Sequence, residues 1–176
     1  MAYETNRVTR LPYSTTATRS ASPSTGINAC HGGGFPGGVA HALKAMQAAF
    51  PLLSDTPLER REVMIVTAFS GPGGRDALEM VTRALTEGRL TVDKSIGGKD
   101  IITDPPGPYV FRFRYRGRTA EAVIKPGHMK EEFVTLGAKK DKTPEEIARH
   151  EELKAEMAYR LLPLPAREVY EAQAVM

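Results

Sequence analysis

The residues best suited to chemistry lie in one glycine-rich stretch, Cys30-His31-Gly32-Gly33-Gly34-Phe35-Pro36-Gly37-Gly38. Glycine permits positive φ and lets another molecule approach the backbone closely, and proline is favoured at the first position of a helix. The stretch therefore predicts a loop that opens a helix at Pro36, where the N–H groups and the helix dipole favour an anion. His31 beside this start is suited to proton transfer near neutral pH. Cys30 is a candidate nucleophile, although a lone cysteine is more often a small buried residue.

A second glycine-proline turn, from Ser70 to Asp76, comes before another segment of helical periodicity. The two turns would line one pocket if they faced each other, or their glycines would serve only close packing against a neighbouring element. Asp76 is a third candidate catalytic residue, although the helix dipole alone favours a carboxylate in a first turn. The candidate binding residues are Gly33, Gly34, Gly37, Gly73, Gly74 and Lys99.

Three helices must position these turns. The first, from about Pro36 to Phe50, would bury a stripe formed by Val39, Leu43, Met46 and Phe50. It is predicted to end at Pro51 and the following Ser54-Asp55-Thr56-Pro57 cluster. The second follows the turn at Ser70. The third begins at Thr143-Pro144-Glu145-Glu146, which has an N-cap threonine, a proline at the first position and a glutamate three residues after the cap. It runs to about Leu162, with His150 among charges and predicted to be solvated; its expected buried side is Ile147, Leu153, Met157 and Leu161.

Strand patterns complete the expected fold. The run from Val63 to Phe69 is almost continuously apolar, which predicts a strand buried on both faces. Alternation from Tyr109 to Tyr115, a turn at Arg116-Gly117-Arg118 and a second alternating run to Lys125 predict a hairpin. A short strand at 90–92 and a C-terminal helix or edge strand at 169–175 are also expected. The sequence predicts a single α+β domain over residues 27–176, with helices packed on a mixed or antiparallel sheet, after a flexible arm at 1–26.

Composition narrows the class of protein. The chain has 176 residues, of which 41% are hydrophobic, so one domain with a real core is expected. Its single cysteine cannot form an internal disulfide, which favours a reducing compartment, and we expect a cytoplasmic location. A signal peptide and a membrane-spanning segment are not expected, because no apolar run has the necessary length.

Arginines alternate with aromatic residues in the predicted hairpin, as they do on some RNA-binding sheets. Such sheets expose their aromatic residues and carry a ribonucleoprotein signature, which this chain lacks. Nucleic acid is therefore an unlikely partner. The simpler interpretation places the aromatic residues in the core and leaves Arg112, Arg114 and Arg116 in solvent opposite carboxylates such as Glu121.

Taken together, these motifs resemble the FmdE-like proteins, a family named after a component of formylmethanofuran dehydrogenase. The family's His-Gly-His-x-Cys-Pro-Gly loop matches the segment from His31 to Gly37 without a gap. Its strand followed by an Asp-Ala helix start matches Ile65 to Ala77, and its Gly-Lys pair matches Gly98-Lys99. A Leu-Leu-Pro segment before a terminal stretch matches 161–175. The resemblance spans about residues 26–176 and implies the fold, a homodimer and a pocket between the glycine turns.

The chain departs from the family at the positions that can serve a metal, usually zinc. Gly33 and Phe35 stand where the family has its second histidine and its cysteine, and a glycine stands near the third ligand position. Glycine and phenylalanine cannot bind zinc. Of the family's metal positions the resemblance leaves His31, and His128 is a further candidate ligand for zinc or another divalent metal; the cofactor stays unknown.

Two functions follow as hypotheses. In the first, the protein is an enzyme of the FmdE-like type in which His31 acts on an anionic substrate at the glycine-rich helix start, with a link to one-carbon metabolism. In the second, it is a non-catalytic binding or accessory subunit of a larger oxidoreductase. Loss of the metal ligands favours the second hypothesis, and retention of the glycine loops favours the first.

Overall fold

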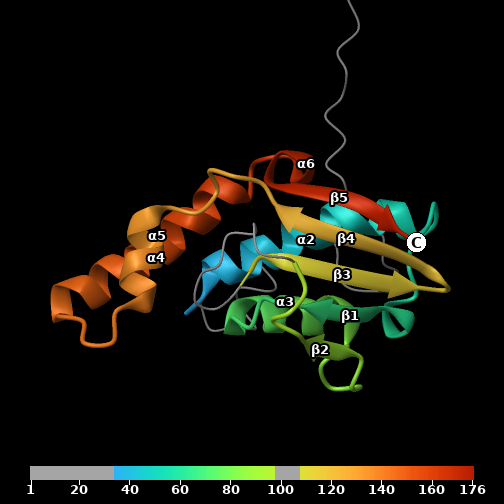
Figure 1. The fold of residues 1–176 in the computed structure, drawn as a ribbon, viewed down its shortest axis with the longest axis horizontal. Helices are drawn as coiled ribbons and strands as arrows, with labels where there is room; N and C mark the ends of the chain where they lie inside the picture. Colours follow the sequence, from blue (N-terminus) through green and yellow to red (C-terminus); the bar gives the residue numbers. More distant parts are fainter. Residues whose placement is uncertain (1–33, 98–107) are drawn as a thin grey trace, which may run out of the picture.

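The computed structural model describes residues 34–97 and 108–176 and confirms an α+β fold with helices packed on a mixed sheet (Figure 1). The arm at 1–26 and the candidate residues Cys30, His31, Gly33 and Lys99 lie outside these ranges. The elements are α2 (Pro36–Leu53), η1 (Arg60–Glu62), β1 (Met64–Thr67), α3 (Pro72–Thr82), β2 (Leu90–Val92), β3 (Val110–Tyr115), β4 (Arg118–Ile124), α4 (Glu131–Ala138), α5 (Pro144–Leu161), α6 (Ala166–Val169) and β5 (Tyr170–Val175).

The five strands form one sheet in the order β2-β1-β3-β4-β5. Strands β1 and β2 are parallel, as expected for strands joined by a helical crossover, here α3. The other neighbouring pairs are antiparallel. The C-terminal segment settles the open alternative between helix and strand by forming both, because α6 leads directly into β5 at the sheet edge.

The predicted hairpin is confirmed as β3 and β4. Arg116 and Gly117 have φ of 45° and 83°, which suits the two-residue turn that matches the twist of paired strands. The aromatic side chains of β3 point into the core, whereas Arg112 faces its cross-strand partner Glu121, with 2.6 Å between guanidinium nitrogen and carboxylate oxygen. The alternation therefore serves the core, as the simpler interpretation of this segment predicted.

Strand β1 differs from the prediction, because only one of its faces is buried. Ile65 and Thr67 are buried, but Met64 is 49% exposed and Val66 is half-buried. Helix α2 packs along one face of the sheet, where it contacts β3, β4 and β5 (Figure 1). The other face of β1 therefore keeps contact with solvent, and the apolar run did not indicate burial on both sides.

Helix α2 is the centre of the structure. It contacts α3 on one side and α5 on another, and twelve of its 18 residues are buried, including the whole predicted stripe. A helix buried on most of its faces needs small residues where neighbours come close, and its alanines supply them. The helix continues to Leu53, beyond the predicted end at Pro51, because Leu53 is buried in the core and a proline near the end removes only one helical hydrogen bond.

Buried polar groups of α2 fasten it to the C-terminal part of the chain. The ammonium group of Lys44, which is 5% exposed, donates hydrogen bonds to the carbonyls of Leu162 at 2.9 Å and Leu164 at 2.5 Å. These carbonyls follow the end of α5, where a cation is favoured by the helix dipole. Burial lowers the pKa of Lys44 from its usual value.

Helices α4 and α5 form a hairpin that projects from the sheet (Figure 1). The capping box of α5 is confirmed, since Thr143 accepts from the N–H of Glu146 and the Glu146 carboxylate accepts from the N–H of Thr143. Ile147 is 51% exposed, so its predicted burial is wrong: the first turn of α5 extends past the core. Helix α4 was not predicted, because only Phe133 on it is buried and its apolar pattern is short.

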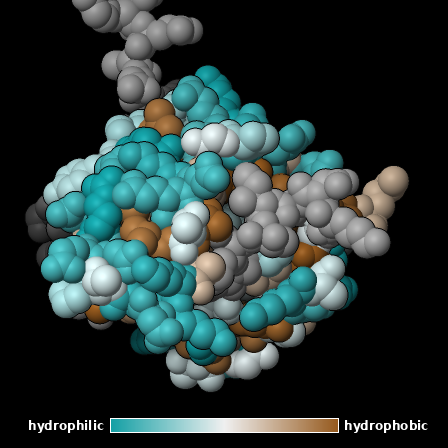
Figure 2. All heavy atoms as spheres, turned by 60° about the vertical axis from the view of Figure 1, so that its left-hand side comes forward, coloured by the Kyte–Doolittle hydropathy of each residue, from teal (hydrophilic) through white to brown (hydrophobic). Residues whose placement is uncertain are grey.

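Figure 2 turns this end of the molecule forward and shows a largely hydrophilic surface with small hydrophobic patches. Ion pairs such as Arg149 with Glu132 join α5 to α4 across this surface. Within the described residues, no helix combines the length and the apolar character that a membrane span requires.

The substitution Lys44→Met should lower the free energy of unfolding by about 2 kcal/mol, because it leaves two partly buried carbonyls without their charged donor. Chemical denaturation monitored by circular dichroism measures the change. The matched control is Lys139→Met, which removes a surface ion pair with Glu146 and should change stability by less than about 0.5 kcal/mol. Equal changes in the free energy of unfolding for the two variants would contradict a stabilising role of the Lys44 hydrogen bonds.

Candidate functional site

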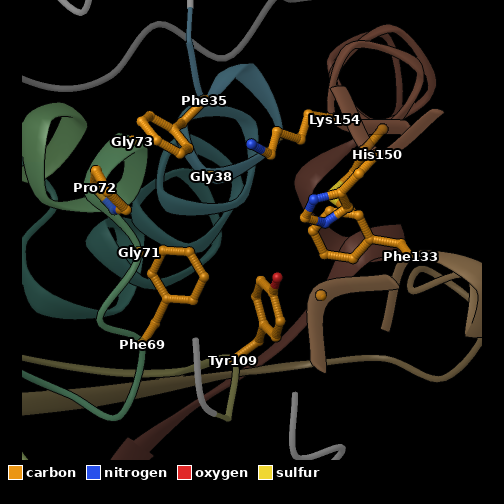
Figure 3. A pocket seen from close by; sticks show the side chains of 13 residues that line it. Phe35, Gly38, Phe69, Gly71, Pro72, Gly73, Tyr109, Phe133, His150 and Lys154 are labelled. Atoms are coloured by element: carbon orange, nitrogen blue, oxygen red, sulfur yellow. The ribbon is translucent and has the colours of Figure 1, made fainter. Parts of the chain in front are cut away.

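A cavity of about 210 Å³ lies where the first turns of α2 and α3 meet the α4–α5 hairpin (Figure 3). Gly37 and Gly38 contribute from α2, Gly71 and Gly73 from the start of α3, and Tyr109 from the residue before β3. The remaining lining residues are Phe35, Phe69, Pro72, Phe133, Gly137, His150, Lys154 and Met157. The cavity is thus lined by both glycine turns and by the α4–α5 hairpin, which the sequence did not connect with them.

The glycines of the two turns allow the helix starts to touch. A Cβ on Gly73 would lie 2.3 Å from the carbonyl oxygen of Phe35, and one on Gly38 would lie 3.1 Å from the backbone nitrogen of Gly74. A Cβ on Gly74 would lie 2.3 Å from the ring of Phe69. Close packing, the second interpretation of these glycines, therefore explains these three, while Gly37, Gly38 and Gly73 also line the cavity.

Aromatic rings form most of the wall. The rings of Phe69 and Tyr109 are 4.8 Å apart at their centroids and lie side by side in Figure 3. On the other side, His150 packs against Phe133 with centroids 4.9 Å apart. The ammonium of Lys154 lies 4.6 Å from the centroid of the Phe35 ring, within cation–π range. The cavity is therefore an aromatic pocket with polar groups supplied by α5.

The two polar side chains from α5 are His150 and Lys154. The side chain of Lys154 is only 14% exposed, and its ammonium pairs with Glu151 at 2.6 Å. Nε2 of His150 is buried and has no hydrogen-bond partner within 34–97 and 108–176. Burial, and secondarily the positive charge of Lys154, lowers the pKa of His150, so this imidazole is neutral at pH 7. His150 is therefore half-buried rather than fully solvated as predicted, because Phe133 of α4 packs against its ring.

The other sequence candidates take different positions. Gly34 directly precedes Phe35, and a Cβ there would meet no atom within 4 Å. Asp76 is exposed on α3 and does not line the cavity. Nε2 of His128 lies 2.9 Å from the backbone oxygen of Glu168, away from the cavity lining. The structure thus brings the two glycine turns together but leaves both Asp76 and His128 outside the pocket.

Sequence reasoning missed His150 and Lys154 as pocket residues, although one signal was available. Met157 was expected on the buried side of its helix, and residues at i−3 and i−7 lie on the same face. Lys154 and His150 occupy those two positions. Their common face could have been predicted, but only the fold shows that Phe133 and Phe35 pack on it.

A buried histidine of α2 packs against the pocket residue Tyr109. His41 is fully buried on α2, and its ring packs at a tilt against that of Tyr109, with centroids 4.5 Å apart. The Nδ1 atom of His41 lies 2.9 Å from the hydroxyl of Tyr170. Burial, with smaller contributions from the positive charges of His128 and Arg160, lowers the pKa of His41 to about 3. Burial also raises the pKa of Tyr170, so His41 and Tyr170 are both neutral, and the neutral His41 packs against the ring of Tyr109.

The described residues contain no group of three or more His, Cys, Asp or Glu side chains that could hold a metal ion. His128 alone does not make a site, since zinc in proteins takes at least three protein ligands. The described part of the chain therefore does not fit the zinc that the family resemblance implied.

The substitution Gly73→Ala should destabilise the fold by about 1–3 kcal/mol, because the new methyl group would collide with the backbone of Phe35. Gly34→Ala is the control, since its methyl group would enter open space and should change stability by less than about 0.5 kcal/mol. Thermal and urea unfolding measure both variants. An undiminished stability of Gly73→Ala would contradict the close contact of the two helix starts.

Folding stability should fall as pH drops below 6.5, the pKa of an unfolded histidine, because His41 resists protonation in the fold until about pH 3. The depressed pKa means that the unfolded state binds the extra proton in this window. The expected slope is about 0.7 kcal/mol per pH unit at pH 6.5 and approaches about 1.4 kcal/mol per pH unit near pH 5, as the unfolded histidine becomes fully protonated. Urea unfolding between pH 6.5 and about pH 5 measures this slope. The window lies above the pH range in which most carboxylates titrate.

The variant His41→Gln should remove most of this slope. His150→Gln is the matched control: the pKa of His150 is lowered as well, but this side chain is less buried, so its removal should have a smaller effect. A full slope in His41→Gln would show that another group causes the acid sensitivity.

No protein-family model matches this chain, and no curated protein matches it at a significant level. The FmdE-like resemblance therefore rests on the motifs quoted above and stays an expectation.

Proposed function

We propose that this protein binds a small molecule with a flat apolar body in the aromatic pocket between α2, α3 and α5. The observation that carries the proposal is the cavity of about 210 Å³ walled by four aromatic side chains. An apolar protein cavity of about 150 Å³ holds one benzene molecule. The pocket therefore has room for a single ring with a small substituent.

The catalytic part of the proposal assigns acid or base chemistry to His31. Phe35 lines the pocket, and three residues lie between it and His31 in the sequence. A step of four residues spans at most about 14 Å, which sets an upper limit on the distance between the backbones of His31 and Phe35. An imidazole within this distance of the pocket would exchange protons with a bound substrate near neutral pH. Cys30, the residue before His31, is the alternative reacting group.

The competing proposal is a binding or accessory subunit without catalysis. It is favoured by the position of Asp76, which lies on the exposed side of α3 rather than in the pocket wall. The homodimer, the larger oxidoreductase partner and the link to one-carbon metabolism follow from the family resemblance alone. No step is assigned to zinc, because the described residues do not supply its ligands.

Binding of para-fluorobenzyl alcohol, followed by fluorine NMR, tests the pocket. This neutral ring should bind saturably to the wild-type protein and lose its affinity in Met157→Trp, which fills the cavity with an indole. Circular dichroism checks that the variant is folded. Non-saturable binding, or full affinity in a folded Met157→Trp, would contradict the pocket proposal.

The side-chain NMR signal of His31 tests its role, with His31→Gln used for assignment. Saturation with para-fluorobenzyl alcohol should shift the His31 signal and leave that of His128, which lies outside the pocket lining, unchanged. If His31 does not respond while the pocket fills, the accessory-subunit proposal takes precedence over the enzyme.

A further inference from the structure

We infer that the ligand of this pocket is an aromatic carboxylate, whose ring lies among the aromatic side chains and whose carboxylate pairs with Lys154. This inference rests on the proposed function and names the class of ligand for the same site. It is carried by the position of one mostly buried cation at the edge of an otherwise apolar cavity.

The walls select a ring. Phe69 and Tyr109 form one side and Phe133 the other, with Phe35 at the edge near Lys154 (Figure 3). Aromatic pairs favour offset or edge-to-face contacts, which such walls offer to a planar ligand from several directions. A linear aliphatic chain would gain the apolar contact but not these ring contacts.

The charge on Lys154 selects an anion. Its ammonium pairs with Glu151, whose side chain is 54% exposed, so the carboxylate can turn to solvent and remain hydrated when the pair separates. A carboxylate inside the pocket would meet the same ammonium in a drier environment, where the attraction between opposite charges is stronger. Lys154 can therefore exchange Glu151 for a ligand without a large loss.

Two further features support the carboxylate. His150 lies one helical turn before Lys154 on the same face of α5, and its buried Nε2 has no hydrogen-bond partner in the described ranges. A neutral imidazole can donate one hydrogen bond to a carboxylate oxygen. Both α2 and α3 begin at the pocket with a proline and without a side-chain cap, so their positive dipole ends face it.

A phosphate fits this site less well than a carboxylate. Phosphate is recognised by several charged or forked donors, commonly arginine. Among the described residues that line the cavity, Lys154 is the one lysine or arginine. One cation and one imidazole match a single negative charge on a planar group.

The test compares two probes of the same shape, para-fluorobenzoate and para-fluorobenzamide, by fluorine NMR at pH 7.5. The wild-type protein should bind the acid about tenfold more tightly than the amide, and added salt should reduce this preference. Lys154→Met keeps the length of the side chain and removes its charge, so it should abolish the preference while amide binding persists. Lys139→Met removes a lysine from outside the lining and should keep the preference.

Equal affinity of the wild-type protein for the two probes would overturn the inference and leave the pocket proposal intact. Retention of the acid preference in Lys154→Met would also overturn it. Failure of the acid, the amide and para-fluorobenzyl alcohol to bind would overturn the proposed function itself, and thus separates the two.

Discussion

The architecture depends on the direct backbone contact between the first turns of α2 and α3. Gly38 and Gly73 face each other at a distance that leaves no room for a side chain. This contact fixes the two helix starts side by side and holds Phe35 against α3. Since Phe35, Phe69 and both starts line the cavity, the position of the pocket follows from this one approach of two backbones.

A second constraint fixes the opposite wall. Helix α2 carries Lys44 and His41 into the interior, where an unpaired polar group is costly. Lys44 donates hydrogen bonds to the carbonyls of Leu162 and Leu164, which follow α5, and Nδ1 of His41 shares a hydrogen bond with the hydroxyl of Tyr170. These contacts anchor the C-terminal half of the chain to α2. They hold α5 in a fixed relation to the glycine turns, which places His150 and Lys154 at the cavity.

The pocket combines a rigid apolar wall with polar groups that keep some freedom. Phe69, Tyr109 and Phe133 belong to the hydrophobic core, whereas Phe35 is 39% exposed and Lys154 pairs with an exposed partner on its own helix. Such a division suits recognition of a small ligand, because the wall sets the shape and the side chains from α5 adjust to the charge. His31 would add its chemistry from the segment that leads into Phe35.

The sequence by itself determined the elements whose signals are local. The capping box at Thr143, the helix starts at Pro36 and Pro144 and the turn at Arg116-Gly117 each depend on residues a few positions apart, so their patterns could be interpreted directly. For the two glycine turns, the sequence left open whether they line one pocket or serve only close packing. Only the tertiary structure decided that Gly38 and Gly73 serve backbone contact, that Met64 and Ile147 face solvent, and that His150 and Lys154 complete the pocket. Those outcomes depend on which surfaces meet between segments that are distant in the sequence, and periodicity along one segment carries no information about its partner.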